Sequence, residues 1–350
     1  MTSSTSVRPS LPATPSTPVL SVRDLHTHFY KDDVVIHAVN GMSLDLFPGE
    51  ILGIVGESGC GKSVTALSIL RLIPRAAGRV VSGSVKFEGF DLLTLPPGEL
   101  ELVRGRDISM IFQEPMTSLN PVLRIGDQVA EGLQLHKGMD RRTAMLRAIE
   151  LLDLVRIADP KRQAQEYPHR LSGGMRQRVM IAMALACEPR VMIADEPTTA
   201  LDVTVQAQIL ELLAALNRQT GAAIMLITHD LGVIAEMARR VIVMYAGTSV
   251  EEATVEDLFA RPLHPYTRGL MTAIPRRGAW RASGGLRDLQ EIPGMVPSLR
   301  EPITGCAFGP RCAYATQQCT REAPTRQVRA NGHTVACWQA DRLETMEAPS

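Results

Sequence analysis

The sequence predicts an α/β fold in which helices cover both faces of a mostly parallel sheet. Short apolar runs with β-branched residues recur along the chain, as buried strands do. Segments with helical spacing lie between several of these runs. This alternation of strand-like and helix-like segments is typical of doubly wound α/β proteins.

The predicted elements follow in chain order. Strands are expected at six apolar runs, namely Pro18–Leu25, Ile51–Val55, Ile108–Phe112, Val191–Ala194, Ala223–Ile227 and Val241–Tyr245. Helices are expected where apolar residues recur every three or four positions, as in Ser63–Leu72, Val203–Leu216 and Leu231–Ala238. The stretch from Gly126 to Met183 has helical patterns, including Arg141–Val155, and no strand. A helical subdomain is therefore predicted at about residues 114–175.

The 350 residues divide by composition into three parts. Met1 to Thr17 is rich in Ser, Thr and Pro, and we expect it to form a flexible tail. Residues 18–260 hold the predicted strands and helices and form the main domain. From Arg261 the composition shifts to Pro, Arg and Gly, and four of the six cysteines occur there, which indicates a separate module over residues 261–350.

Composition and charge exclude several classes of protein. The chain has 37 basic and 37 acidic residues, so its formal charge is zero and it lacks the overall basic character of nucleic-acid or membrane-surface binders. Hydrophobic residues make up 45%, which is typical of a globular protein. No apolar run approaches the ~18 residues of a membrane helix, and a secretory signal is absent, so we expect a cytosolic chain.

A glycine-rich loop follows the second predicted strand and opens a helix. It reads Gly56-Glu57-Ser58-Gly59-Cys60-Gly61-Lys62-Ser63, which is the phosphate-binding loop (P-loop) of nucleoside triphosphatases in its usual context. Glycines let backbone N–H groups approach phosphate, and the helix N-terminus attracts anions. Lys62 would neutralise the β- and γ-phosphates, and the Ser63 hydroxyl would ligate Mg²⁺. The loop predicts that a nucleoside triphosphate binds here with Mg²⁺.

A second motif is the apolar strand Val191–Ala194, which ends in Asp195 and Glu196. In a parallel sheet this end lies at the same edge as the P-loop. Asp195 is therefore expected to hold Mg²⁺, and Glu196 is expected to activate the attacking water.

The third motif, Leu171-Ser172-Gly173-Gly174-Met175-Arg176-Gln177-Arg178, has Ser172 placed to cap a helix. With these three motifs in this order, the sequence resembles the ATP-binding cassette (ABC) family from about Val19 to Ala260. The resemblance implies a P-loop ATPase core with an antiparallel β subdomain and a helical subdomain. It also implies that Ser172, Gly173, Gly174 and Gln177 bind ATP held by a second ATPase domain, so that two domains enclose two nucleotides.

Further family positions match single residues of this chain. Gln113 matches the glutamine that contacts Mg²⁺ and the attacking water, and His229 matches the histidine that contacts the γ-phosphate. Asp202, in Ala200-Leu201-Asp202, matches the family's D-loop. Phe29 resembles the aromatic residue that stacks on adenine, although the adjacent Tyr30 could take that place.

Three segments resemble the ATPase subunits of oligopeptide and dipeptide importers in particular. They are the signature segment from Leu171, the run Gln113-Glu114-Pro115-Met116-Thr117-Ser118-Leu119-Asn120-Pro121 and the run Arg261-Pro262-Leu263-His264-Pro265-Tyr266-Thr267-Arg268. The resemblance implies three kinds of partner: a second homologous ATPase subunit in a heterodimer or homodimer, two integral-membrane permeases, and an extracytoplasmic substrate-binding protein. It also implies a peripheral position at the cytoplasmic face of the inner membrane.

Two alternatives remain at this point. Nickel importers belong to the same subgroup, and nothing in this chain selects the solute. A nucleic-acid-acting ABC ATPase is disfavoured, because the chain has one cassette, zero net charge and no sustained heptads.

The module after Arg261 contains a group of cysteines, Cys306, Cys312, Cys319 and Cys337. Disulfides are disfavoured in the cytosol, and the close pairs of a typical zinc site are absent. Four thiolates suit either Zn²⁺ or a [4Fe–4S] cluster. The resemblance to importer ATPases with cysteine-bearing C-terminal regions favours the cluster, with Zn²⁺ as the alternative.

Overall fold

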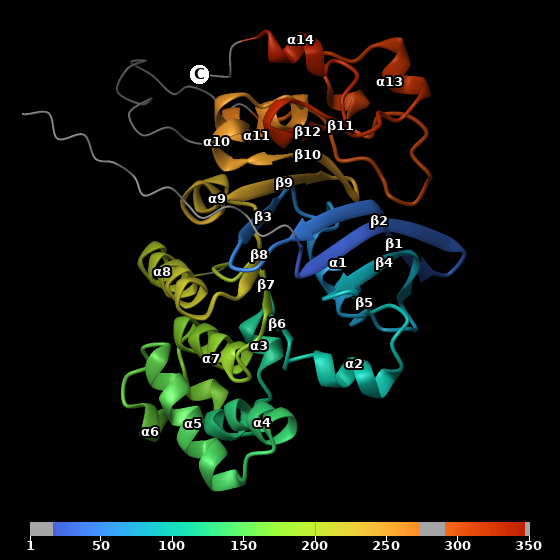
Figure 1. Cartoon of the computed structure of the whole chain (residues 1–350). Helices are drawn as coiled ribbons and strands as arrows, with labels where there is room; N and C mark the ends of the chain where they lie inside the picture. Colours follow the sequence, from blue (N-terminus) through green and yellow to red (C-terminus); the bar gives the residue numbers. More distant parts are fainter. Residues whose placement is uncertain (1–16, 200, 274–290, 347–350) are drawn as a thin grey trace, which may run out of the picture.

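The computed structural model describes residues 17–199, 201–273 and 291–346 (Figure 1). The predicted tail therefore lies outside the described residues, except for Thr17. An eight-stranded main sheet has the order β11-β12-β10-β9-β3-β8-β7-β6. Its strands are β3 (Ile51–Val55), β6 (Ile108–Ile111), β7 (Val191–Asp195), β8 (Ala223–Ile227), β9 (Arg240–Tyr245), β10 (Thr248–Thr254), β11 (Gln327–Val328) and β12 (Thr334–Val335).

The main sheet is mixed. Strands β9, β3, β8, β7 and β6 are parallel, as predicted, whereas β10, β12 and β11 add an antiparallel extension. The parallel strands carry apolar residues on both faces, as expected for strands covered on both sides.

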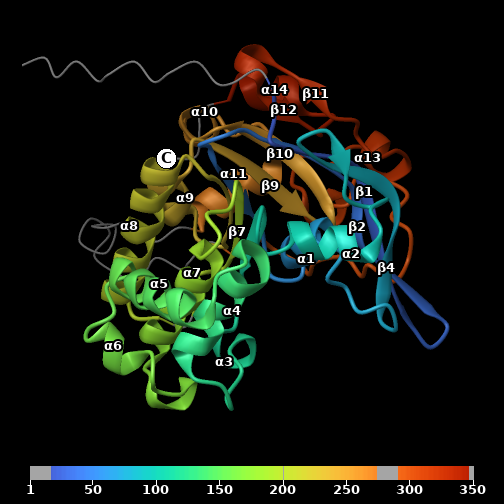
Figure 2. The same ribbon diagram turned by 60° about the horizontal axis from the view of Figure 1, so that its bottom comes forward.

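A second, four-stranded antiparallel sheet has the order β2-β1-β4-β5, which confirms the antiparallel subdomain. Its strands are β1 (Leu20–Lys31), β2 (Val34–Leu46), β4 (Gly78–Phe87) and β5 (Phe90–Asp91). The predicted strand Pro18–Leu25 therefore belongs to this sheet and not to the parallel one. Figure 2 shows the long hairpin of β1 and β2 projecting from the body of the molecule.

Helices fill the space around the sheets and form a separate lobe. The helices up to residue 185 are α1 (Lys62–Ile69), α2 (Pro97–Val103), α3 (Pro115–Ser118), α4 (Ile125–Lys137), α5 (Arg141–Leu154), α6 (Pro160–Gln163), the 3₁₀ turn η1 (Pro168–Arg170) and α7 (Gly173–Leu185). Helices α4 to α7 lie together at the end of the molecule opposite the C-terminal residues (Figure 1). No strand interrupts residues 115–185, in line with the predicted helical subdomain.

The remaining helices follow the acidic strand. They are α8 (Val203–Thr220), α9 (Leu231–Met237), α10 (Val255–Ala260), α11 (Pro265–Thr272), η2 (Gly309–Arg311), α13 (Gln317–Arg321), η3 (Ala330–Gly332) and α14 (Ala340–Glu344). None of the helices among the described residues is both long enough and apolar enough to cross a membrane.

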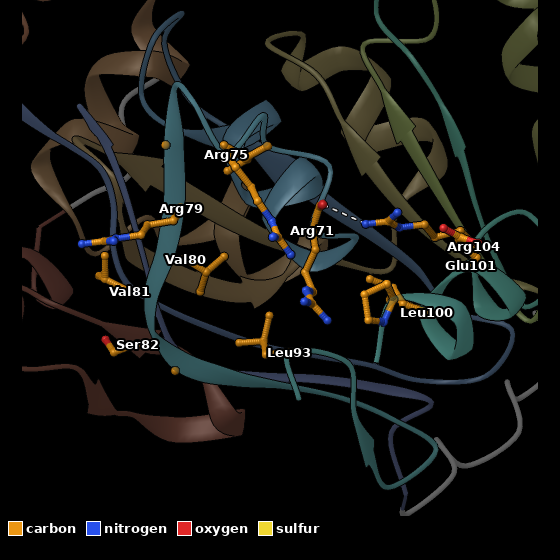
Figure 3. A pocket seen from close by; sticks show the side chains of 14 residues that line it. Arg71, Arg75, Arg79, Val80, Val81, Ser82, Leu93, Leu100, Glu101 and Arg104 are labelled. Carbon is orange, nitrogen blue, oxygen red and sulfur yellow. Dashed lines mark hydrogen bonds between the residues drawn. The ribbon is translucent and has the colours of Figure 1, made fainter. Parts of the chain in front are cut away.

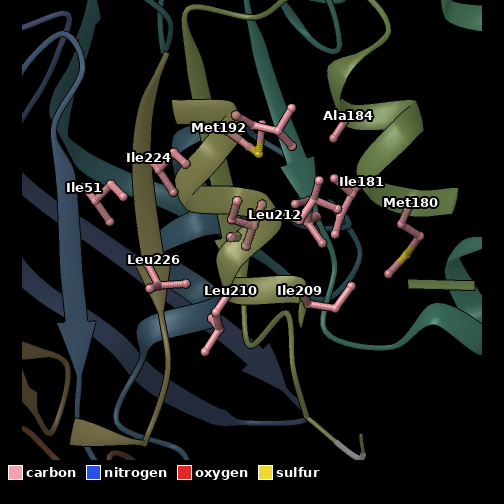
Figure 4. Close-up of a cluster of buried hydrophobic side chains, with 14 of the residues drawn as sticks. Ile51, Met180, Ile181, Ala184, Met192, Ile209, Leu210, Leu212, Ile224 and Leu226 are labelled. Carbon is pink, nitrogen blue, oxygen red and sulfur yellow. The ribbon is translucent and has the colours of Figure 1, made fainter. Parts of the chain in front are cut away.

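The strand alternation builds two hydrophobic cores, one on each face of the main sheet. In β3, Ile51 and Val55 face a core with α7 and α8, whereas Leu52 and Ile54 face a core with α1 and the antiparallel sheet. Figure 4 shows the first core, where side chains of α7 and α8 meet those of β3, β7 and β8. Because both faces are filled, the ends of the parallel strands are fixed firmly relative to one another.

The C-terminal residues join the main sheet through β12, which pairs with β10. A buried carboxylate stabilises this junction: Glu251 accepts hydrogen bonds from the backbone N–H groups of Leu263 (2.6 Å) and His264 (3.0 Å). The ring Nε2 of His333 lies 2.7 Å from the same carboxylate. Burial lowers the pKa of His264 to about 4, so this histidine is neutral and caps α11 with its Nδ1.

Candidate active site

The P-loop connects β3 to α1 and lies in close contact with its neighbours. A side chain at Gly56 would come within 2.2 Å of the Met244 carbonyl oxygen. Gly61 has φ of +100°, and a side chain there would come within 2.4 Å of the Ala38 carbonyl oxygen. Gly61 is also the N-cap of α1 and makes no side-chain capping bond, so the first N–H groups of this helix are available to an anion.

Lys62 is buried and points back along the loop. Its Nζ donates to the carbonyl oxygens of Gly56 (2.8 Å) and Glu57 (3.1 Å). These two bonds hold the ammonium group at the mouth of the loop, where a triphosphate would lie. Cys60 is buried beside it, and burial raises the pKa of its thiol, so Cys60 has a packing role here.

Asp195, at the end of β7, lies next to the start of α1. Ser63 Oγ donates a 3.0 Å hydrogen bond to Asp195 Oδ1. The pKa of Asp195 is raised to about 6, mainly by burial; the neighbouring Glu196 also raises it, whereas the bond from Ser63 and the charge of Lys62 lower it. A hydroxyl and a carboxylate in contact are the hard oxygen donors that Mg²⁺ prefers, so the donor set fits this ion.

Glu196 is the meeting point of three side chains from different loops. Gln113 Nε2 donates to Glu196 Oε2 (3.2 Å), and Thr199 Oγ1 donates to the same oxygen (2.8 Å). His229 Nδ1 lies 3.4 Å from Glu196 Oε1. The structure thus brings together the residues that the sequence assigns to catalysis, although they are spread over more than a hundred positions of the chain. Thr199 is an addition that the motifs did not reveal.

The signature segment forms the N-terminus of α7. Ser172 caps this helix, with its Oγ accepting from the Met175 N–H (3.3 Å), and both Ser172 and Gly173 are exposed. Gly174 is enclosed, since a side chain there would come within 2.8 Å of Val205 on α8. The exposed half of the motif is therefore open to another molecule.

Gln177 departs from the prediction. It is only 2% exposed, and its Nε2 is buried without a hydrogen-bond partner within the described residues. A nucleotide held by a second subunit cannot touch a side chain that is covered in this way. The motif assignment did not take burial into account, and the buried stretch of α7 begins at Gln177.

Two further predicted site residues lie at the edges of this region. Asp202 is exposed and caps α8 through a 2.9 Å bond from the Val205 N–H. Phe29 is half-buried on β1, opposite Ile36 and next to Gly78, whereas Tyr30 is exposed under the guanidinium of Arg79.

Two residues from the C-terminal part of the chain contact the P-loop. Tyr266 accepts a 2.8 Å hydrogen bond from the Glu57 N–H, and Arg311 forms an ion pair with the Glu57 carboxylate. The motifs did not reveal either residue. The signal that could have found them is the carboxylate of Glu57 itself, since an acid in a phosphate-binding loop calls for a cation beside it.

The four C-terminal cysteines line one small pocket together with His264 and Phe308. All of them have free thiols. Within residues 17–199, 201–273 and 291–346, no group of three or more His, Cys, Asp or Glu side chains is placed to hold a single metal ion. The geometry thus gathers the predicted ligands around one space but does not by itself support a metal.

Comparisons with known proteins agree with this site. Residues 39–199 match the ABC transporter family, and residues 250–319 match the C-terminal region of oligopeptide/dipeptide transporters. A probable peptide ABC transporter ATP-binding protein of Sinorhizobium fredii is 56% identical over 325 residues, which cover 93% of this chain and 96% of the relative. The dipeptide transport ATP-binding protein DppD of Bacillus subtilis is 49% identical over 324 residues, or 93% and 95% of the two chains.

Among solved structures, the dimeric ATP-binding cassette MJ0796 in a post-hydrolysis state with ADP and Pi is similar, with a TM-score of 0.61 and 29% identity. The match covers 67% of this chain and 98% of that one. The P-loop, the acidic pair after β7 and the exposed signature thus occur on the fold, and in the sequence context, of known transport ATPases. The chain belongs to the ATP-binding proteins of the oligopeptide/dipeptide import family of ABC transporters, the subunits that hydrolyse ATP to drive transport.

Proposed function

We propose that the chain hydrolyses ATP with Glu196 as general base and drives the import of di- or oligopeptides through separate permeases. The observation that carries the catalytic part is the convergence of Gln113 and His229 on the carboxylate of Glu196, at the sheet edge that also holds Lys62. Mg²⁺ would neutralise phosphate charge when bound, and Ser63, Asp195 and Gln113 are the residues to hold it.

In this proposal Glu196 accepts a proton from the attacking water. Gln113 and His229 fix the orientation of its two oxygens, and Thr199 holds one of them from the other side. Lys62 and the N-terminus of α1 bind the phosphates, and Phe29, or Tyr30 beside it, stacks on the base.

The test is Glu196→Gln in the assembled transporter. A positioned general base contributes a factor of ~10² to 10⁴, so hydrolysis should fall by that factor while ATP binding is retained. Lys62→Ala is the matched comparison, because it should abolish ATP binding itself. Turnover of Glu196→Gln at the parent rate would assign the base to another residue.

We propose that the site is completed by a second ATPase subunit, either a homologue or a second copy. Ser172 and Gly173 are exposed at the start of α7, where N–H groups and the helix dipole suit a γ-phosphate brought by another subunit. Among the described residues, the nearest neighbour of a side chain at Gly173 would be Leu201 at 3.8 Å, so no close contact there requires a glycine. Asp202, the N-cap of α8, is exposed as well.

A docking place for the permeases is proposed between the main sheet and the helical subdomain. An apolar groove of about 330 Å³ is lined by Leu70, Leu72, Phe112, Met180 and Met183, among others. Phe112 is 38% exposed and directly precedes Gln113, so a segment seated in this groove would contact the residue next to the catalytic group.

A basic cavity of about 540 Å³ adjoins this groove, and Arg104 borders both (Figure 3). Its other arginines are Arg71, Arg75 and Arg79. Arg71 and Arg104 donate to backbone carbonyl oxygens only, and none of the four has an ion-pair partner within the described part of the chain. The cavity lining holds four arginines and one carboxylate, Glu101, so its charge is positive on balance. An apolar groove beside this positive charge suits a permease segment with an apolar face and acidic side chains at one end.

The docking proposal predicts that Arg75→Glu with Arg79→Glu weakens co-purification with the permeases and leaves ATP binding by the chain unchanged. The control is Arg218→Glu, a charge reversal at the far end of α8. Retention of the permeases by the double variant, or cross-linking of a permease solely to residues 291–346, would overturn it. Docked in this way, the chain is a peripheral subunit at the cytoplasmic face of the membrane.

Peptide is proposed as the solute because relatives named for peptide, dipeptide and oligopeptide transport match over more than nine-tenths of this chain. An extracytoplasmic binding protein would deliver it. In the reconstituted complex, ATPase activity should rise with the binding protein loaded with di- or oligopeptides. Stimulation by Ni²⁺ in place of peptides would favour the nickel importers of the same subgroup.

We also propose that residues 18–260 form the ATPase domain, with the helical subdomain at about 114–175, and that residues 261–350 form an extension holding a [4Fe–4S] cluster. Backbone N–H groups of Tyr314, Thr316 and Gln339 point at the sulfurs of Cys312, Cys319 and Cys337 at 3.3 to 3.5 Å, which favours thiolates. Burial raises the pKa of Cys337 to about 12, so this thiol would lose its proton only on binding a metal or cluster.

Anaerobically purified chain should be brown and contain about four irons if the four cysteines ligate one cubane. If the purified chain were colourless and contained stoichiometric zinc, Zn²⁺ and not a cluster would occupy the same ligands. If Cys312→Ser retained its full metal content, Cys312 would not be a ligand.

A further inference from the structure

The P-loop of this chain contains a carboxylate, Glu57, whose charge needs an explanation. An anionic side chain in a loop that binds polyphosphate repels its ligand, and the repulsion is stronger where water is partly excluded. The side chain of Glu57 is 25% exposed, so solvent screens its charge only in part.

Arg311, 254 positions further along the chain, neutralises this carboxylate. Its Nη1 donates to Glu57 Oε2 (2.8 Å) and its Nη2 donates to Glu57 Oε1 (3.1 Å), which is the two-pronged geometry of a strong pair. The side chain of Arg311 is only 6% exposed. The bonds to Glu57 raise the pKa of Arg311, so it keeps its charge.

The rest of the Arg311 guanidinium is held in place by the C-terminal residues. Its Nε and Nη2 donate to the carbonyl oxygens of Pro293 (3.0 Å) and Ile292 (3.1 Å), and its Nη1 also donates to the Tyr245 hydroxyl (3.3 Å). Phe308 packs against the ring of Tyr245, at 5.3 Å between ring centroids. The arginine is thus a fixed part of the structure and not a loose surface side chain.

The backbone of Glu57 is held as well. Its N–H donates to the Tyr266 hydroxyl (2.8 Å), and its carbonyl oxygen accepts from Lys62 Nζ (3.1 Å). The residue that orients the phosphate-binding lysine is therefore fixed at its N–H by Tyr266 and at its carboxylate by Arg311.

We infer that Arg311 is a positioning residue of the ATP site: it cancels the charge of Glu57 and fixes the loop residue that holds Lys62. Tyr266 supports the same residue from the backbone side. The C-terminal extension therefore takes part in nucleotide binding, a role beyond the transport function proposed above.

The test is a double-mutant cycle read out as binding of a fluorescent ATP analogue, with Mg²⁺, to the purified full chain. Arg311→Met leaves the Glu57 charge uncompensated, and affinity should fall by about tenfold or more. Glu57→Gln removes the charge that needs compensation, so replacing Arg311 should cost much less affinity in this background than in the parent. The combination of Glu57→Gln with Arg311→Met should bind like Glu57→Gln, because the charge conflict is gone.

This rescue separates positioning from a general structural role. If Arg311 acted only by stabilising the extension through Ile292 and Pro293, Glu57→Gln would not restore binding, and that result would overturn the inference. Parent-like affinity of Arg311→Met would overturn it too. Arg329→Met is the matched control, since Arg329 pairs with exposed Asp341 in the same extension, and it should bind ATP normally.

Arg311→Lys keeps a positive charge but loses the two-pronged geometry, and it serves if Arg311→Met does not fold. Its affinity should fall by about two- to fivefold and return with Glu57→Gln, whereas an unchanged affinity would contradict the inference. Because the readout is nucleotide binding by the chain alone, failure of the peptide, permease or catalytic-base proposals would leave it unaffected.

Discussion

Ser63 Oγ and Asp195 Oδ1 lie 3.0 Å apart, and this hydrogen bond joins the first turn of α1 to the end of β7. The bond satisfies one oxygen of a carboxylate that is only 3% exposed. It does not offset the cost of burial, because the pKa of Asp195 is raised to about 6. The nucleotide-free chain therefore bears a strain that a bound cation would relieve.

Asp195→Asn should stabilise the nucleotide-free chain at pH 7.5, by up to about 3 kcal/mol, since the raised pKa makes ionisation of the folded state costly. The stability contributed by the protonated group is fully present below the unfolded pKa near 4 and is lost as the pH rises through about 6. The advantage of the variant should therefore shrink as the pH is lowered from 6 to 4. Urea unfolding at several pH values measures it.

Asp153→Asn, at an exposed position of α5, is the control and should change stability little at any pH. In the presence of ATP and Mg²⁺ the parent should be more stable than Asp195→Asn, because the variant lacks a proposed Mg²⁺ ligand. An advantage of Asp195→Asn that did not depend on pH would show that ionisation is not its cause.

The two glycines of the signature should respond differently to alanine. Gly174→Ala places a methyl group 2.8 Å from Val205 and should destabilise the chain by about 1 to 3 kcal/mol. The methyl group of Gly173→Ala meets no atom of the described residues closer than 3.8 Å, so the free energy of unfolding should stay unchanged or rise slightly.

For ATPase activity of the assembled transporter, the variant with the smaller effect on stability, Gly173→Ala, should lose more activity than its stability change explains. Gly173→Ala should reduce turnover strongly in an otherwise well-folded subunit, since its methyl group lies on the surface proposed to receive the second nucleotide. Full activity of Gly173→Ala in the complex would place the subunit contact elsewhere.

Glu251→Ala should destabilise the attachment of the C-terminal residues by about 3 to 5 kcal/mol, because it leaves the N–H groups of Leu263 and His264 and the ring of His333 without their acceptor. Limited proteolysis and thermal unfolding measure the effect. Glu236→Ala, an exposed glutamate on α9, should shift neither. Equal behaviour of the two variants would show that the buried carboxylate does not stabilise this junction.

Local patterns predict the parallel core well, because each signal lies within a few residues. The expected bounds of β3 and β8 are those of the structure, and the acidic pair does end β7. Gln113 and His229 match positions of a known family, and the structure places both beside Glu196. That these residues belong to one site follows from the resemblance to a known family, because their separation along the chain does not indicate that they lie close together.

The features that the sequence did not predict depend on contacts between distant parts of the chain or on burial. Strand β12 has only two residues, too few to show a strand pattern, and it pairs with β10 beside the contact between His333 and Glu251. The pairing of Arg311 with Glu57 spans 254 positions and leaves no local pattern. Gln177 was placed at a subunit surface because it belongs to a motif, whereas burial is decided by which turn of α7 faces the core.

The long span of the Arg311–Glu57 pair has a consequence for the newly made protein. At a synthesis rate of about 5 to 20 residues per second, roughly 13 to 50 seconds separate the translation of Glu57 from that of Arg311. During that interval the carboxylate of Glu57 lacks its arginine, and until residue 266 has been made its backbone N–H also lacks the Tyr266 hydroxyl. If Arg311 positions the P-loop as inferred, a chain whose synthesis has not yet reached Arg311 should bind ATP more weakly than the complete chain.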